Sequence, residues 1–142
     1  MIRAEELGFH SVWMEEHYST KDHCWPSPLP VLAGFATRTS QVRLGTDILV
    51  FPFYHPVRLA EDVALLDIMS NGRFVLGTTI GYKPDEFAPC DTPLEKRGAR
   101  FVEVLASIVR RTVDTLVAVD LIAPLDQSAR TQRPAQAFHQ PG

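Results

Sequence analysis

The chain has 142 residues, of which 45% are hydrophobic and 22% charged, as in ordinary globular domains with one modest core. Its formal net charge is −3 and its basic residues are scattered, which argues against nucleic acid or an anionic membrane as a partner. No apolar run approaches the ~20 residues that a membrane span needs, and no secretory signal is present. Because Cys24 and Cys90 lie outside any CxxC pair, we expect reduced thiols and a cytoplasmic location.

The first third of the chain predicts a helix, a strand and a second helix. Residues 2–7 have the character of the last turns of a helix, which Gly8 would end. The segment HSVWMEEH (10–17) is typical of a strand with polar residues at its carboxyl end. After a loop over 18–27, the apolar segment 28–39 predicts a helix, since its prolines fall in the first turn, where they are tolerated.

The block RLGTDILVFPFYHPVRLAEDVALLDIMSNGRFVLG (43–77) predicts strand, helix and strand in close succession. The strand over 41–51 ends in an apolar run, as expected of a strand buried on both faces in a parallel sheet. A helix over 56–70 follows, with Val63, Leu66 and Met69 on one side. Asn71-Gly72 would end it, and a third strand is predicted over 73–79.

The last part of the chain predicts one long helix and a tail. Thr92-Pro93-Leu94-Glu95 has the pattern of a capping box, which would open a helix running to about Val117. Phe101, Leu105, Ile108 and Val109 would lie on one side of that helix. Toward the carboxyl terminus apolar periodicity fades and prolines recur. We therefore expect one partial domain over 1–119 and a disordered or non-native tail over 120–142.

Three strands that alternate with helices predict an α/β protein with a parallel sheet built from βαβ units. Functional sites in such folds lie at the carboxyl ends of the strands. This rule selects His17 after the first strand, Phe53 to His55 after the second, and Thr79 to Lys83 after the third. We expect His17 and His55 to converge, with His17 as a proton-transfer group. For His55, a solvated or helix-capping role is favoured over a catalytic one.

Asp47 is unusual because it interrupts an apolar strand. A buried carboxylate is costly unless it is paired, so either function requires it, or the strand curves and lets it reach an amide or water. The spacings of histidine and cysteine match no common zinc pattern, and no metal site is predicted. Dinucleotide-binding GxGxxG and nucleophile-elbow GxSxG motifs do not occur.

Four segments together carry a family resemblance: AEELGFHSVWMEEHY, the 43–77 block, GYKPDEF and PLEKRGARF. They resemble the amino-terminal half of the luciferase-like flavin-dependent monooxygenases, a superfamily that includes bacterial luciferase and deazaflavin-dependent relatives. The resemblance extends from Ala4 to about Arg111. Its combination HPVRLAEDVALLD with SNGRF is specific, whereas any short piece of it is weak.

The resemblance implies a TIM (β/α)8 barrel in which reduced FMN, delivered by a separate flavin reductase, binds at the carboxyl ends of the strands. There it would use O2 to oxidise an aldehyde, ketone or similar small organic substrate. His17 matches the family's active-site histidine, as a base or a substrate-orienting group. Asp47-Ile48 matches a non-proline cis peptide bond beneath the flavin ring. The resemblance therefore places Asp47, Ile48 and Thr79 at the cofactor. Thr79 stands where the light-emitting luciferases have a cysteine, so bioluminescence is not expected.

The family's first strand and later strands have no counterpart in this sequence, so the resemblance implies an incomplete barrel. Three functions remain open: a truncated flavin-dependent monooxygenase, a non-catalytic remnant that binds flavin or forms dimers, or an oxidoreductase that uses deazaflavin (F420). If the chain folds, a dimer is expected.

Overall fold

The computed structural model describes residues 1–18 and 27–122, with side chains up to residue 111. The first elements are α1 (Ile2–Glu6), β1 (Ser11–Met14), α2 (Pro28–Ala36), β2 (Arg43–Thr46), β3 (Leu49–Val50) and the 3-10 helix η1 (Phe51–Phe53). They are followed by α3 (Pro56–Met69), β4 (Phe74–Val75), β5 (Thr78–Thr79), α4 (Pro84–Phe87), the 3-10 helix η2 (Leu94–Lys96) and α5 (Arg97–Ile122).

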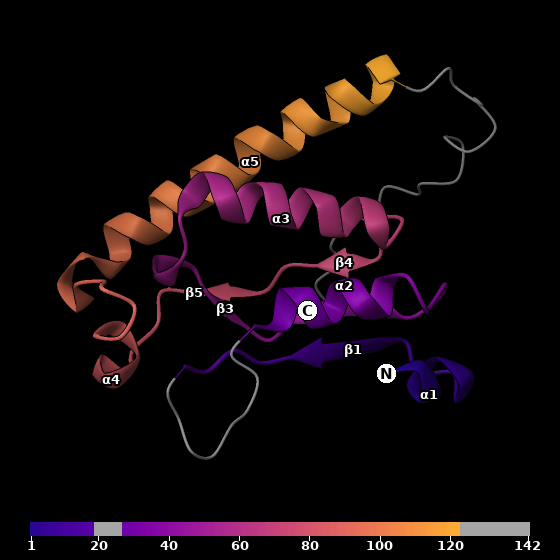
Figure 1. Ribbon diagram of the computed structural model, residues 1–142, viewed down its shortest axis with the longest axis horizontal. Helices are drawn as coiled ribbons and strands as arrows, with labels where there is room; N and C mark the ends of the chain where they lie inside the picture. The colour runs from indigo at the N-terminus through magenta and orange to yellow at the C-terminus, as the bar shows by residue number, and fades with distance from the viewer. Residues whose placement is uncertain (19–26, 123–142) are drawn as a thin grey trace, which may run out of the picture.

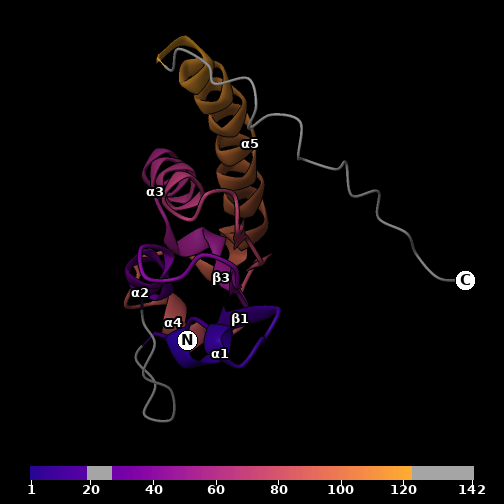
Figure 2. The ribbon, with the colours of Figure 1, turned by 90° about the vertical axis from the view of Figure 1, so that its right-hand side faces the viewer.

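The strands are parallel and alternate with helices, as predicted for part of a (β/α)8 barrel. One sheet has the order β1-β2-β4, and a second consists of β3 and β5. The helices α2, α3 and α5 lie along the outer side of the curved strand layer (Figures 1 and 2), with α4 beyond the carboxyl end of β5. The strand ends that should carry chemistry therefore meet near α4.

The predicted strands over 41–51 and 73–79 are each divided into two short strands. The peptide bond between Asp47 and Ile48 is cis, where the resemblance places one, and the chain there leaves the β2 ladder and joins β5 through β3. Thr46 Oγ1 donates to Gly77 O (2.8 Å) and accepts from Gly77 N (2.9 Å) at the step between the two sheets. A Cβ on Gly77 would clash with Thr46 O. This side chain bond therefore joins the two ladders where the backbone pairing changes.

The core lies between the strands and the outer helices. Leu32 of α2, Leu44 of β2, Phe51 of η1 and Leu59 of α3 are fully buried. Because the apolar positions of α3 recur at helical spacing, Leu59, Val63 and Leu66 reach this core.

Residues that were predicted to share one side of a helix are not equally buried in α3 and α5. Met69 is 37% exposed and does not share the burial of Val63 and Leu66. On α5 the buried residues are Val104 and Ile108, whereas Leu105 and Val109 are exposed. The three- and four-residue spacing that identified these helices fixes their periodicity, but the width of the buried stripe depends on neighbouring elements.

The predicted ends of the first and third helices are confirmed. After α1, Gly8 has φ +79° and its N–H donates to Glu5 O, while Phe9 N donates to Ala4 O. Asn71 and Gly72 make the equivalent pair of bonds after α3, with φ values of 55° and 74°. Both ends are Schellman motifs, in which a left-handed residue satisfies the last helical carbonyls.

The predicted capping box at 92–95 is wrong. Thr92 Oγ1 donates to Cys90 O (3.0 Å) and Pro52 O (3.4 Å), because Thr92 is buried against η1 rather than placed at a helix start. The long helix begins at Arg97, after η2, and continues to Ile122. It therefore crosses the proposed boundary at 119, while residues 123–142 of the predicted tail lie outside the described part of the chain.

Two charged side chains tie elements together at the end of the fold away from α4. Arg73 donates to Ala36 O and Thr39 O after α2, to Val42 O, to Thr39 Oγ1 and to Ser70 O at the end of α3. Glu5 accepts the N–H groups of Ser40, Gln41 and Val42 at 3.0, 2.7 and 2.8 Å. These hydrogen bonds from backbone N–H groups lower the pKa of Glu5.

Within the described residues, none of the helices combines the length and apolar character that crossing a membrane requires.

Candidate functional site

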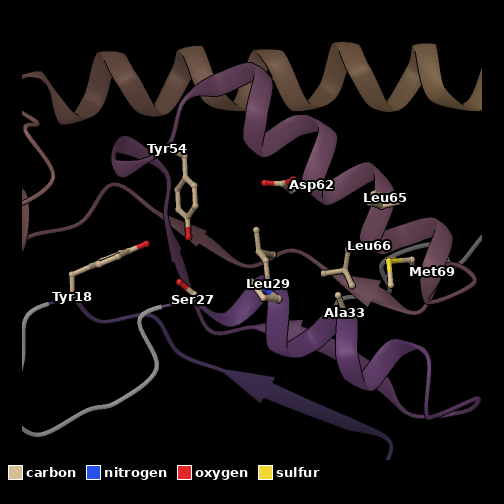
Figure 3. A pocket seen from close by; sticks show the side chains of 10 residues that line it. Tyr18, Ser27, Leu29, Ala33, Tyr54, Asp62, Leu65, Leu66 and Met69 are labelled. Atoms are coloured by element: carbon tan, nitrogen blue, oxygen red, sulfur yellow. The ribbon is translucent and has the colours of Figure 1, made fainter.

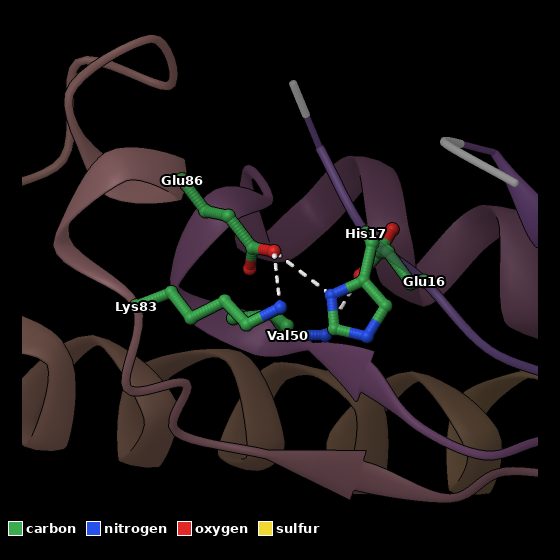
Figure 4. Close-up of polar contacts among 5 residues, drawn as sticks. All are labelled: Glu16, His17, Val50, Lys83 and Glu86. Atoms are coloured by element: carbon green, nitrogen blue, oxygen red, sulfur yellow. Dashed lines mark hydrogen bonds and ion pairs between the residues drawn. The ribbon is translucent and has the colours of Figure 1, made fainter. Parts of the chain in front are cut away.

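The carboxyl end of β1 and the short helix α4 meet through a hydrogen-bonded histidine. His17 Nδ1 lies 2.8 Å from Glu86 Oε1 (Figure 4). Glu86 is 4% exposed and belongs to α4, which starts at Pro84, a residue favoured in the first turn of a helix. Because an ionised carboxylate can only accept, Nδ1 carries the proton in this pair. The second ring nitrogen, Nε2, then bears the lone pair.

Lys83 shares the same carboxylate oxygen. Its Nζ lies 3.7 Å from Glu86 Oε1 and 5.8 Å from the centroid of the Tyr82 ring. The lysine side chain is 34% exposed, whereas that of Glu86 is 5% exposed. Lys83, Glu86 and His17 thus form a continuous polar cluster where β1 and β5 end.

Glu16, the residue before His17, is a buried carboxylate with its own set of donors. It is 2% exposed, and its Oε2 accepts the N–H of Val50 at 2.7 Å. Its Oε1 accepts the hydroxyls of Tyr18, at 3.2 Å, and Tyr54, in a shorter hydrogen bond. Glu16 therefore connects the end of β1 with the end of β3 and with the segment before α3.

Burial dominates the electrostatics of this cluster. Desolvation raises the pKa of Glu16, against the hydrogen bonds from Tyr54 and Val50, and nearby Glu86 adds to the increase. Desolvation and the negative charge of Glu16 raise the pKa of Tyr18 to about 12, and the same causes raise the pKa of Tyr54. The pKa of the Cys90 thiol is also raised, by burial and by the charges of Glu16 and Glu86.

Of the three residues expected at a cofactor, Asp47 and Ile48 lie between β2 and β3, and Thr79 ends β5. Asp47 is exposed, and its backbone N–H donates to Met14 O at 2.7 Å. Of the two readings of Asp47, the structure fits the one in which the strand curves and the side chain reaches water, because the chain turns out of the ladder there; the buried carboxylate is Glu16. Ile48 is 38% exposed, and Thr79 is half-buried on β5, its Oγ1 accepting Gly81 N at 3.4 Å.

An open apolar surface surrounds these positions. Trp13 lies across Gly45 on the neighbouring strand, where a Cβ would collide with its ring, and remains 48% exposed. With Glu15 and Asp47 it lines a hollow of about 640 Å³ that also reaches α2. Ile48 and Ile80 are likewise 38% and 41% exposed. Large apolar side chains left open beside strand ends fit a planar ring system, which would cover them.

A second hollow, of about 300 Å³, lies between α2 and α3 (Figure 3). Tyr18 and Tyr54 stand at one end of it, and Leu29, Leu66 and Met69 are among its apolar walls. His17 and Lys83 are not among its lining residues. The two tyrosines therefore separate this groove from the buried carboxylate of Glu16.

Sequence reasoning placed His17 correctly at a strand end but missed its partners. His55 is exposed at the start of α3, and its neighbour Tyr54 is the residue of that segment that hydrogen-bonds to the cluster, through Glu16. Glu86 could have been found from Pro84, which signals a helix start directly after the third strand. Glu16 could have been found from strand alternation, which places it on the same side as the buried Met14.

Among the described residues, no group of three or more histidine, cysteine, aspartate or glutamate side chains could hold a metal ion. His23 and Cys24, two of the residues weighed for such a role, lie outside the described part of the chain.

The sequence matches the family described as "Luciferase-like monooxygenase" over residues 2–140. The chain belongs to this family. Among curated relatives, the oxygenase component of the flavin-dependent trigonelline monooxygenase of Acinetobacter baylyi is 41% identical over 78 residues, which are 55% of this chain and 22% of that protein. The luciferase-like match agrees with the parallel strands that alternate with helices.

Solved structures of luciferase-like proteins share the fold. The monooxygenase RslO1 of Streptomyces bottropensis superposes with a TM-score of 0.71 and 38% identity over 77% of this chain and 35% of that one. The oxygenating constituent of 3,6-diketocamphane monooxygenase from Pseudomonas putida, solved with FMN, gives 0.67 and 23% identity over 78% of this chain and 30% of that one. The chain thus spans about a third or less of the length of these relatives.

Proposed function

We propose that this chain forms the part of a flavin-dependent monooxygenase that carries the catalytic histidine, acting on a small organic substrate with reduced FMN and O2. The observation that carries the proposal is the pair His17–Glu86, with 2.8 Å between Nδ1 and Oε1, at strand ends beside exposed apolar side chains. Family membership supports flavin-dependent oxygenation, and the relative from Acinetobacter is named as flavin-dependent.

The flavin would lie against the open surface around Asp47-Ile48 and Thr79. Trp13, whose ring lies across Gly45, and Ile48 offer apolar contact there. Thr79 adds a hydroxyl group next to this apolar area, which suits a ring system that carries polar groups. When bound, reduced FMN supplies two electrons and activates O2.

His17 would move the proton that the oxygenation requires. Glu86 fixes the tautomer by accepting from Nδ1, so Nε2 is the atom that takes up or returns a proton. Lys83 Nζ lies 3.7 Å from the same Glu86 oxygen, and the hydrogen bond to the buried Glu86 carboxylate holds the imidazole in one orientation. This arrangement is a carboxylate-oriented histidine, suited to act as a base or to orient the substrate.

Flavin titration tests the cofactor. We expect the purified chain to quench the fluorescence of FMN on binding, and we expect Ile48→Asp to weaken binding more than the matched variant Val102→Asp on exposed α5. Absence of any spectral change with oxidised or reduced FMN would refute the proposal. Binding of deazaflavin without O2 uptake would replace the oxygenase with an F420-dependent oxidoreductase.

Oxygen uptake with reduced FMN and a panel of aldehydes and ketones tests the chemistry. We expect His17→Asn to lower substrate oxidation ~100-fold or more, the usual effect of losing a general base, with FMN affinity retained. His55→Asn, an exposed histidine on the next segment, is the control and should be nearly silent. If the chain binds FMN but oxidises no substrate, it is the non-catalytic flavin-binding remnant.

We also propose a partner enzyme, an oligomeric state and a cellular location. A separate flavin reductase would supply reduced FMN, in keeping with a relative named as an oxygenase component. A homodimer is supported by the exposed apolar residues Leu65, Ile68 and Met69 on α3, and Leu65→Lys should shift sedimentation toward the monomer. A cytoplasmic location is supported by the unpaired Cys90.

A further inference from the structure

Glu16 has no part in the proton transfer proposed for His17, although the two residues are adjacent. Its carboxylate is 2% exposed and accepts three hydrogen bonds. Burying a charge is costly unless donors compensate it, and an apolar residue of similar size is often at least as stabilising. Stability alone therefore does not explain why a carboxylate occupies this buried position.

The bond from Val50 N–H to Glu16 spans a gap in the strand layer. The ladder between β1 and β2 ends at Met14 and Thr46, and Asp47 N–H makes one further bond to Met14 O. Beyond that point Val50 pairs with Thr79 of β5 rather than with the chain from β1. The Glu16 carboxylate, at 2.7 Å from Val50 N, takes over the role of the missing backbone pairing.

Val50 is in turn packed against the segment that carries Glu86. Gly81 separates the two: a Cβ on Gly81 would lie 2.7 Å from Val50 Cγ1 and 3.0 Å from the ring of Phe87. Phe87 follows Glu86 on α4 and is 2% exposed. Its ring also meets that of Phe53, with 4.8 Å between centroids. The position of α4 thus depends on where Val50 is held.

These contacts close a ring that starts and ends at neighbouring residues. Glu16 holds Val50, Gly81 lies between Val50 and Phe87, and Glu86, the residue before Phe87, returns to His17; Figure 4 shows the two hydrogen bonds. We propose that Glu16 is a positioning residue for His17, because its bond to Val50 sets the separation between the end of β1 and α4. The inference extends the role proposed for His17, but it concerns geometry that exists without flavin or substrate.

The tautomer of His17 provides the readout, observed by NMR of the chain labelled with 15N-histidine. In the unchanged protein we expect mainly the Nδ1–H form, because Glu86 accepts that proton. Glu16→Leu keeps similar volume and removes the acceptor of Val50 N–H. We expect it to lower the Nδ1–H population of His17 at least ~twofold, because the pair with Glu86 is no longer held in register.

Two further variants separate positioning from folding. Glu16→Gln still has an oxygen that can accept from Val50 N–H, and should retain the Nδ1–H population of the unchanged protein. Glu16→Asp keeps the charge on a side chain shorter by one carbon, and should lose Nδ1–H population as Glu16→Leu does. Glu95→Leu, at an exposed acid before α5, is the control and should leave His17 unchanged.

An unchanged His17 tautomer in folded Glu16→Leu or Glu16→Asp would overturn the inference. If Glu16→Leu does not fold, the contrast between Gln and Asp decides. Loss of the Nδ1–H form in the Gln variant as well would also overturn the role of the Val50 bond. Because the readout uses neither FMN nor O2, failure of the proposed oxygenase activity would leave this result intact and distinguishable.

Discussion

Replacing Arg73 with lysine should destabilise the fold strongly while leaving its charge unchanged. The guanidinium donates five hydrogen bonds of 2.7 to 3.0 Å, four to backbone carbonyls and one to Thr39 Oγ1. Two of those carbonyls, Ala36 O and Ser70 O, belong to the ends of α2 and α3. A planar fork reaches them together, and an ammonium group with three donors does not.

The magnitude follows from the number of bonds lost. Lysine leaves at least two of the five acceptors without their donor, and a hydrogen bond to a charged group contributes ~1.5–3 kcal/mol. Because the site is half-buried and water partly replaces the lost donors, we expect about 3 kcal/mol in the free energy of unfolding. In a chain of this size, that corresponds to a fall in Tm of roughly 6–12 °C.

Urea unfolding followed by circular dichroism measures this effect. The midpoint should fall with an unchanged slope, since the surface exposed on unfolding stays the same. Arg58→Lys, at an exposed arginine on α3, is the matched control and should stay within ~0.5 kcal/mol of the unchanged protein. If Arg73→Lys also stays within that range, the guanidinium does not hold the two helix ends.

Three other outcomes are expected. Gly77→Ala should cost about 1–3 kcal/mol, because its Cβ would clash with Thr46 O, whereas Gly34→Ala on α2, with open space around it, should be neutral or stabilising in the same urea assay. Since the pKa of Glu5 is lowered from 4.5, its stabilisation is present above that pH and is lost as pH falls through the folded pKa; the stability difference from Glu5→Gln should therefore shrink in acid, and a constant difference would contradict this. Cys90 should react with iodoacetamide at pH 8 several-fold more slowly than in the urea-unfolded chain, because burial raises its pKa; equal rates by mass spectrometry would contradict this.

The alternation of strands and helices could be predicted because each element carries a local signal. Gly8 and Asn71-Gly72 mark helix ends through backbone conformations that few other residues adopt. The parallel arrangement follows from helices between strands. The strand breaks were not predictable in this way, because they depend on the exchange of ladder partners between residues distant in sequence.

The candidate site was half predictable for the same reason. His17 follows a strand, and strand ends are where such folds place their chemistry. The exposure of Asp47 could not be decided from the sequence, because a carboxylate in an apolar run fits a functional requirement as well as a strand that curves toward water. Glu86 acquires its role only when α4 folds back on β1, a contact between residues 69 positions apart. Single-sequence patterns do not report contacts of that range.

The change of pairing partners divides the strand layer into two sheets, which are joined by the hydrogen bonds between Thr46 and Gly77. The first sheet, β1-β2-β4, has the longer pairing, and the bonds of Glu5 and Arg73 hold the segment just before β2. The second sheet, β3 with β5, contains Thr79 and adjoins His17 and Glu86. A change of strand register in this second sheet need not propagate into the first, so residues at the candidate site can change while the first sheet preserves the architecture.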